Sequence, residues 1–161
     1  MPAVVLLVLY LTLTPGGIQE AGTFDRTVEV VAGQVIMASD LPLVRALKLV
    51  ASTDDSDAAV LTALENRLLV LGEVARSAQP PPPSGDVDAR RGQWEAALGA
   101  GGPAVAQRLA DAHMTEAALM AWLRDDVRIQ RYEDQRFGRQ QDPAAAVARW
   151  IVDLRKRAGL K

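Results

Sequence analysis

A run of four prolines at residues 80–83 limits, more than any other feature, how this chain can fold. Proline has no backbone N–H to donate, and inside a helix its ring clashes with the preceding turn. We therefore expect no helix to cross the run, which forms a stiff spacer between two helical parts of the chain. Recognition by a proline-binding domain is the alternative interpretation, but the role of a linker explains the run more simply.

Helix signals stand on both sides of the proline run. Over residues 57–78 the apolar side chains recur at intervals of three and four, which indicates one amphipathic helix. After the run, one helix carries Trp94 and Leu98, and Pro103 begins another, shorter helix. The chain on both sides of the spacer is therefore expected to be helical.

Two further helices are expected toward the end of the chain. Thr115 stands at the N-cap position of a long helix over residues 116–137. The apolar positions of this helix cover more than half of its circumference, so neighbouring helices have to wrap around it. Asp142 and Pro143 form the cap-then-proline start of a final helix, whose last turn is basic.

The segment before the first helix predicts a β-hairpin. Residues 27–31 and 34–38 are short β-rich runs, and only Ala32 and Gly33 separate them. Two residues is the spacing of a tight hairpin turn. Because an isolated hairpin is only marginally stable, it has to pack on the helices. The predicted fold class is therefore mainly α, a helical domain with a small N-terminal β-hairpin.

A first helix is expected directly after the hairpin. Ser39 stands at its N-cap position, and Asp40 in the first turn complements the helix dipole. Pro42 fits the first turn, where the missing N–H of proline is not needed. We expect this helix to run as far as Val50.

The chain begins with an apolar run from Ala3 to Leu13. A membrane-spanning helix needs about 20 apolar residues, so this run is too short to be one. It has the length of the apolar part of a signal peptide, although no basic residue precedes it and the cleavage pattern is poor. A buried strand is the alternative. We expect a signal peptide over residues 1–22, a domain over residues 23–161, and no stable membrane span once the signal is removed.

Composition excludes several function classes. The formal net charge is −2, whereas a nucleic-acid-binding protein needs a strongly basic face, so no nucleic-acid partner is expected. The chain has no cysteine, which excludes disulfides, thiolate catalysis and cysteine-bound zinc. Aromatic residues make up only 4% of the chain, so its core has to consist mainly of Ala, Val and Leu.

Motifs that carry chemistry are absent from the sequence. The single histidine, His113, has no evident partners for a metal site. Residues 54–57 read DDSD but lack the glycine and the distal glutamate of a calcium loop, and helix capping explains them better. No phosphate loop, dinucleotide fingerprint or nucleophile turn is present. We expect no catalytic residue, no metal and no cofactor.

The stretch DRTVEVVAGQVIMASDL, residues 25–41, carries a pattern of acidic, basic, β-branched and glycine positions that ends in a Ser-Asp-Leu helix start. It resembles the N-terminal domain of the SurA-type periplasmic chaperones, in which this pattern makes the hairpin and leads into the first helix. Ala32 departs from the pattern, because the family usually has Asn or Asp in the turn. Positions that fit are Asp25, Arg26, Val28, Val30, Val31, Gly33, Ile36, Ser39, Asp40 and Leu41.

The resemblance continues in order along the chain. Residues 61–76 look like the second helix of the family and residues 113–137 like its long helix, and residues 147–160 resemble the C-terminal helix that completes the domain. In the larger relatives, parvulin domains lie between the last two helices, where this chain has only residues 138–141. One histidine and no cysteine also cannot supply a parvulin site. Prolyl isomerase activity is therefore not expected, and neither is any other enzyme activity.

What the resemblance implies is a periplasmic chaperone that binds unfolded or extended polypeptide without ATP, with outer-membrane proteins as clients. The peptide-binding groove of such a chaperone needs accessible apolar surface, and methionine or aromatic side chains can repack around varied peptides. For each candidate the alternative is a place in the core. The candidate peptide-binding residues are Met37, Trp94, Met114, Met120, Trp122 and Tyr132.

A different class of function is the second hypothesis. The same surface of the domain would then serve a non-catalytic adaptor or dimerisation module, holding one dedicated protein partner or a second copy of the chain as a homodimer. Dependence of the oligomeric mass on concentration would favour this hypothesis.

Overall fold

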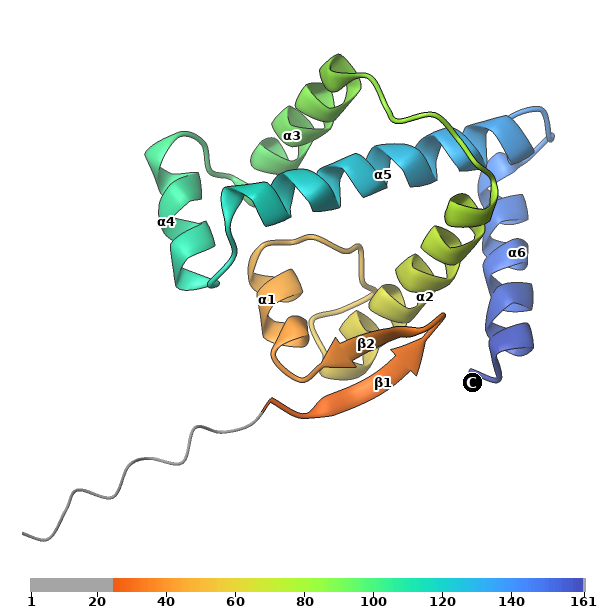
Figure 1. The fold of residues 1–161 in the computed structure, drawn as a ribbon, viewed down its shortest axis with the longest axis horizontal. Helices are drawn as coiled ribbons and strands as arrows, with labels where there is room; N and C mark the ends of the chain where they lie inside the picture. Colours follow the sequence, from red (N-terminus) through yellow and green to blue (C-terminus); the bar gives the residue numbers. More distant parts are fainter. Residues whose placement is uncertain (1–24, 161) are drawn as a thin grey trace, which may run out of the picture.

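A computed structural model describes residues 25–160 of the chain. The predicted signal peptide, residues 1–22, lies outside the described residues. The predicted fold class is confirmed, because the described chain is mainly helical with a small antiparallel hairpin near its beginning (Figure 1). The elements in chain order are β1 (Thr27–Val31), β2 (Gln34–Met37), α1 (Asp40–Ala46), α2 (Asp57–Arg76), α3 (Ser84–Leu98), α4 (Pro103–Asp111), α5 (Glu116–Phe137) and α6 (Pro143–Ala158).

The hairpin closes through a turn in which both residues have positive φ. Ala32 has a φ of 50° and Gly33 a φ of 79°. Positive φ at both central positions is the type I′ geometry, whose twist matches that of the two strands. Val31 and Ile36 are buried and anchor the hairpin to the helical core. The turn is therefore as predicted, but an alanine occupies a position that usually favours Asn or Gly.

Ser39 stands at the N-cap position of α1, as expected, but its side chain does not cap the helix. Ser39 has helical backbone angles, and its side chain makes no cap hydrogen bond. Its hydroxyl donates to the carboxylate of Asp25 instead, and its backbone N–H donates to the other oxygen of that carboxylate over 3.2 Å. Asp40 accepts from the backbone N–H of Met37 over 2.7 Å. The serine thus ties the start of the hairpin to the start of α1.

Helix α1 also ends earlier than expected, at Ala46 rather than near Val50. Lys48 has a φ of 48°, a left-handed conformation that a helix cannot continue through. Leu47 and Leu49 on either side of it are buried. Both leucines therefore lie just after α1 rather than within it, and they fill the core from there.

Helices α2, α5 and α6 begin at side-chain caps, whereas α3 and α4 begin without one. Each cap accepts from one of the backbone N–H groups that a helix leaves unpaired at its beginning. The caps are Ser56 Oγ from the N–H of Ala59 over 3.2 Å, Thr115 Oγ1 from that of Ala118 over 3.1 Å, and Asp142 Oδ1 from that of Ala145 over 3.0 Å. Residues 80–83 form the predicted break between α2 and α3.

Helix α5 is the longest helix in the described part of the chain, and the others pack around it (Figure 1). It contacts α3, α2 and α6, while α2 also contacts α1, α6 and β1. A polar contact joins α2 to α6: Arg155 Nη1 donates to Glu65 Oε2 over 2.7 Å and to Asn66 Oδ1 over 3.0 Å. The C-terminal helix therefore completes the core that the hairpin and α2 begin.

Candidate functional site

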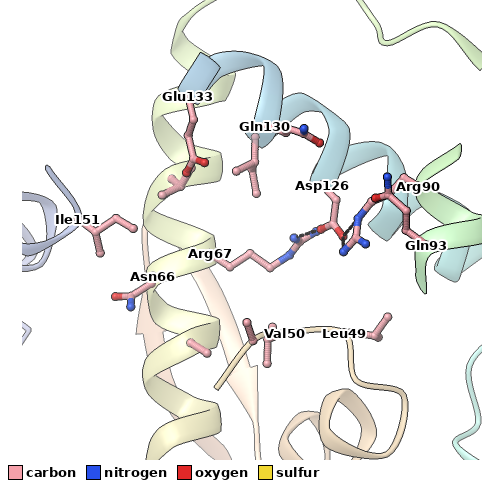
Figure 2. A pocket seen from close by; sticks show the side chains of 14 residues that line it. Leu49, Val50, Asn66, Arg67, Arg90, Gln93, Asp126, Gln130, Glu133 and Ile151 are labelled. Carbon is pink, nitrogen blue, oxygen red and sulfur yellow. Dashed lines mark hydrogen bonds and ion pairs between the residues drawn. The ribbon is translucent and has the colours of Figure 1, made fainter. Parts of the chain in front are cut away.

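A groove with a volume of about 540 Å³ opens between α2, α3 and α5. The loop after α1 and one residue of α6 also reach it (Figure 2). We call it the central groove. Its apolar lining residues come from four separate parts of the chain: Leu49, Val50, Ala51, Ala63, Val70, Ile129 and Ile151.

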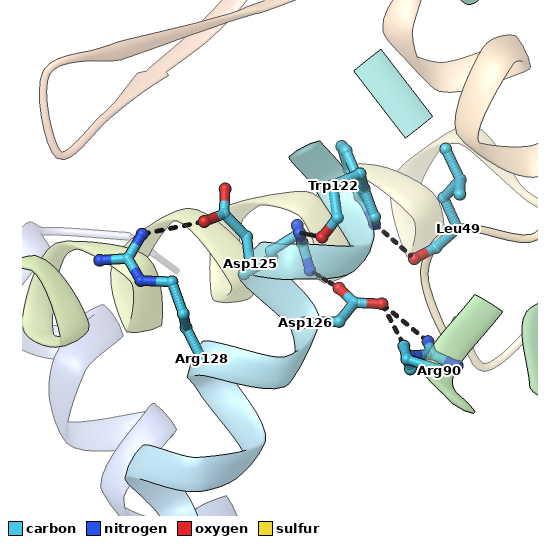
Figure 3. Close-up of polar contacts among 7 residues, drawn as sticks. Leu49, Arg90, Trp122, Asp125, Asp126 and Arg128 are labelled. Carbon is cyan, nitrogen blue, oxygen red and sulfur yellow. Dashed lines mark hydrogen bonds and ion pairs between the residues drawn. The ribbon is translucent and has the colours of Figure 1, made fainter. Parts of the chain in front are cut away.

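One carboxylate holds two arginines in the wall of the central groove. Asp126 on α5 accepts from Nη1 of Arg67 on α2, and its second oxygen accepts from Nε and Nη2 of Arg90 on α3, over 3.0 and 2.7 Å (Figure 3). The side chains of Asp126 and Arg67 are each only 10% exposed. Because the partners come from three helices, this contact fixes α2, α3 and α5 relative to one another.

Arg67 makes two further contacts with Trp122. Its Nη2 donates to the backbone carbonyl of Trp122 over 3.0 Å, and its guanidinium carbon lies 3.9 Å from the centroid of the indole ring. Burial lowers the pKa of Arg67, while the charge and hydrogen bond of Asp126 oppose that shift. Arginine is effectively always protonated in proteins, so the guanidinium of Arg67 is charged at neutral pH.

Two tryptophans fix the loop that forms one side of the central groove. Trp94 Nε1 donates to the carbonyl of Leu47 over 2.7 Å, and Trp122 Nε1 donates to the carbonyl of Leu49 over 3.3 Å. Trp94 is only 1% exposed. Both hydrogen bonds satisfy carbonyl groups that the early end of α1 leaves without helical partners. These two hydrogen bonds thus fix the position of the loop that lines one side of the central groove.

Amide side chains and one glutamate complete the lining. Asn66, Gln93 and Gln130 supply both donors and acceptors, and they come from α2, α3 and α5. Glu133 on α5 also lines the groove, and burial, together with the charge of Asp134, raises its pKa. The central groove therefore offers apolar surface beside neutral amide groups and two arginines, Arg67 and Arg90, that Asp126 holds in place.

The six candidates from the sequence lie elsewhere, and none of them lines the central groove. Trp94 is buried in the core, and half-buried Trp122 lies beneath Arg67. Tyr132 on α5 is half-buried, with its ring centroid 5.7 Å from that of Trp150. These three aromatics therefore support the helices around the groove rather than facing into it.

The three methionine candidates are spread over the molecule. Met37 is half-buried at the end of β2, where its sulfur accepts from Thr27 Oγ1 over 3.7 Å. Met114 lies in the turn before α5, packed against the core. Met120 is half-buried on α5, with its sulfur 3.9 Å from Nη1 of Arg91. The structure does not bring these methionines together into one surface.

The polar wall of the groove was not anticipated from the sequence, although a signal for it was present. Arg67 interrupts the apolar pattern of α2 at a position that packs against α5, and Asp126 does the same on α5. Charged residues are seldom buried unless they are paired. Opposite charges on the inner faces of two predicted helices therefore indicate a buried ion pair between them.

Within residues 25–160, no group of three or more His, Cys, Asp or Glu side chains is placed to hold a metal ion. None of the helices in that range is long and apolar enough to cross a membrane. Comparisons with protein-family models, curated proteins and solved structures find no match to this chain. The function has to be argued from the groove itself.

Proposed function

We propose that this chain binds extended polypeptide segments in the central groove and acts as a chaperone without ATP. The observation that carries the proposal is the composition of the lining, in which apolar side chains from four elements lie beside the amides of Asn66, Gln93 and Gln130. Apolar contact provides affinity that tolerates many sequences. Amide groups can pair with the N–H and C=O of any extended backbone.

The wall of the groove suits this role because it does not have to rearrange. Arg67 and Arg90 already share Asp126, so the binding of a segment leaves these three charges paired. The two arginines are matched in number by two acidic lining residues, Asp126 and Glu133, so the groove as a whole favours neither sign of charge in the bound segment.

The resemblance to SurA-type chaperones extends the proposal to a compartment and to clients. We assign the chain to the periplasm, with unfolded outer-membrane β-barrel proteins as clients; this step rests on analogy with that family. Fractionation of cells that carry a C-terminally tagged chain tests the compartment. Recovery in the cytoplasm with an uncleaved N-terminus would overturn this part of the proposal and leave the groove argument standing.

A light-scattering assay tests the holdase activity. The purified chain, in modest molar excess and without nucleotide, should suppress aggregation of a denatured outer-membrane β-barrel protein that is diluted out of urea. Ile151→Ser removes an apolar group that lines the groove and should weaken this suppression. Val152→Ser makes the same kind of change at the next residue of α6, which is 49% exposed and lines no groove, and should have no effect.

Two results would overturn the proposal. One is a folded chain that fails to suppress aggregation any better than an unrelated protein of similar size. The other is an equal loss of suppression in the Ile151→Ser and Val152→Ser variants. A mass that rises with concentration, in a chain without suppression, would favour the dimerisation module instead.

A further inference from the structure

A second groove, which shares no lining residue with the central groove, lies between the hairpin, α2 and the end of α6. Figure 1 shows where these elements lie in the fold. The volume of this second groove is about 360 Å³. Leu69 of α2 and Leu154 of α6 lie at its base, and Val30 of β1 stands at its side. We call it the hairpin groove. Of the two strands, only β1 contributes lining residues, Val30 and Val31, so the groove opens beside the end of β1 next to the turn.

The side of β1 that faces away from β2 is a free strand edge. Within the part of the chain that the structure describes, β2 is the only strand paired with β1. Val31 pairs with Gln34 next to the two-residue turn, so the N–H and C=O of Val30 point outward by antiparallel alternation. The Val30 N–H donates to Oε1 of the adjacent Glu29 over 3.4 Å, a long and exposed hydrogen bond that an incoming strand would have to replace. An outward N–H and C=O at a strand edge are a template for one more extended chain.

The valines on the outer face of the hairpin add apolar surface next to this edge. Val30 and Val35 are cross-strand partners, and they are 56% and 52% exposed. Both belong to the short set of large apolar side chains that the described residues leave exposed. An added strand would cover part of the Val30 side chain, and alternate side chains of that strand would reach the apolar base of the groove.

The far rim of the hairpin groove is basic. Arg76 of α2 and Arg157 of α6 share one carboxylate, that of Glu73, with Arg157 Nη2 3.9 Å from its Oε1. Both arginine side chains are more than half exposed, so most of their donors are available to a ligand. Two positive charges and one negative charge leave a net positive rim that complements a carboxylate.

We propose that the hairpin groove is a second binding site, which takes an extended peptide as a third strand on the free edge of β1, with a carboxylate of that peptide on Arg157 and Arg76. The strand edge requires an extended peptide, and the basic rim favours a negative charge on that peptide. The carboxylate is that of an acidic side chain. This site is separate from the central groove and does not depend on it.

The probe is a fluorescein-labelled seven-residue peptide of alternating Thr and Val that ends in two glutamates, with its terminus amidated. Fluorescence anisotropy with the full chain should show saturable binding. The same peptide with lysines in place of the glutamates should bind about tenfold more weakly. N-methylation at alternate backbone nitrogens removes the donors that pair with an edge strand, and it should abolish binding. A version with a free C-terminus and no glutamate distinguishes a terminal carboxylate from an acidic side chain.

Matched variants test the edge and the rim. Val30→Pro removes the outward N–H of β1 without touching the bonds to β2, and should weaken binding about tenfold. Val35→Pro makes the equivalent change on the opposite edge of the hairpin and should leave binding intact. Arg157→Glu should weaken binding of the acidic peptide, whereas Lys156→Glu, at an exposed neighbour outside the groove, should have far less effect.

Equal binding of the N-methylated and the unmodified peptide by the unaltered chain would overturn the proposal, whether or not the proline variants fold. Equal effects of Val30→Pro and Val35→Pro in folded variants would do the same. A dimer that is lost in Val30→Pro, without peptide binding, would assign the edge to a second copy and contradict the proposal. Ile151→Ser in the central groove should not change this binding, so failure of the first site and failure of the second can be told apart.

Discussion

The guanidinium carbon of Arg67 lies 3.9 Å from the centroid of the Trp122 ring, and Nη2 of the same arginine donates to the Trp122 carbonyl. One side chain of α2 therefore binds both the ring and the backbone of α5. The ring in turn donates to the Leu49 carbonyl, at the edge of the central groove. This chain of contacts sets the spacing between α2, α5 and the loop after α1, and so the width of the groove.

Asp126→Asn should lower the free energy of unfolding by about 3 kcal/mol, because it leaves two arginines in the groove wall without their shared counter-charge. Urea unfolding followed by circular dichroism measures the loss. The control is Asp125→Asn at the adjacent, more exposed residue, which forms an ion pair with Arg128 and does not line the groove (Figure 3). Its cost should stay below about 0.5 kcal/mol. Similar costs for the two variants would mean that Asp126 does not organise the wall.

Trp94→Phe should destabilise the chain by about 2–4 kcal/mol, since it removes a buried hydrogen bond and leaves a void beside the Leu47 carbonyl. Trp122→Phe should cost less, because this ring is only half-buried and its bond to Leu49 is longer. The thermal midpoints of the two variants give the comparison. The reverse order would contradict the role of Trp94 as the main support of the loop after α1.

Glu133→Gln should stabilise the fold relative to the unaltered protein, and this gain should be larger at about pH 7 than at about pH 4. Burial and Asp134 raise the pKa of Glu133 in the folded chain, so the fold binds that proton more tightly than the unfolded chain does. The stability contributed by the proton is present below the ordinary carboxyl pKa and is lost as pH rises through the raised value. Glutamine does not titrate and avoids the loss. Urea midpoints that differ equally at both pH values would refute this account of Glu133.

Ala32→Asn should raise the free energy of unfolding by about 0.5–1 kcal/mol, because Asn tolerates the left-handed conformation better than Ala at this turn position. Ala78→Gly should give a similar gain, since Ala78 has a φ of 49° directly after the end of α2. The two sites share no partner and their gains should add. A lower free energy of unfolding in Ala32→Asn would show that the close approach to α2 favours alanine at this position. The Cβ of Ala32 lies 3.5 Å from the place that a Cβ on Gly72 would occupy.

The sequence predicts elements well where one local interaction decides the outcome. Thr115 and Asp142 cap the helices expected of them, and the prolines at 80–83 break the chain where expected. Ser39 occupies the expected N-cap position but does not cap the helix, because its hydroxyl donates to the carboxylate of Asp25 across the hairpin. The sequence does not show which distant group lies next to a potential cap.

The groove was harder to predict than the helices for the same reason. Arg67, Arg90 and Asp126 are far apart in the sequence and meet only because α2, α3 and α5 pack together. Residue type alone favours methionine and aromatic side chains such as Trp94, which packing buries. Residue chemistry identifies what could bind a peptide, and only tertiary packing decides which residues remain accessible.

Site-specific photo-crosslinking tests the central claim, that the central groove holds extended polypeptide. A benzophenone amino acid replaces Gln130, an exposed residue that lines the groove, or Gln107, an exposed residue of α4 that does not. Each chain is irradiated with a denatured outer-membrane β-barrel protein during its dilution from urea. We expect crosslinks to the client from position 130 and few or none from position 107. Equal crosslinking from both positions, or crosslinking from position 107 alone, would contradict the assignment of the groove.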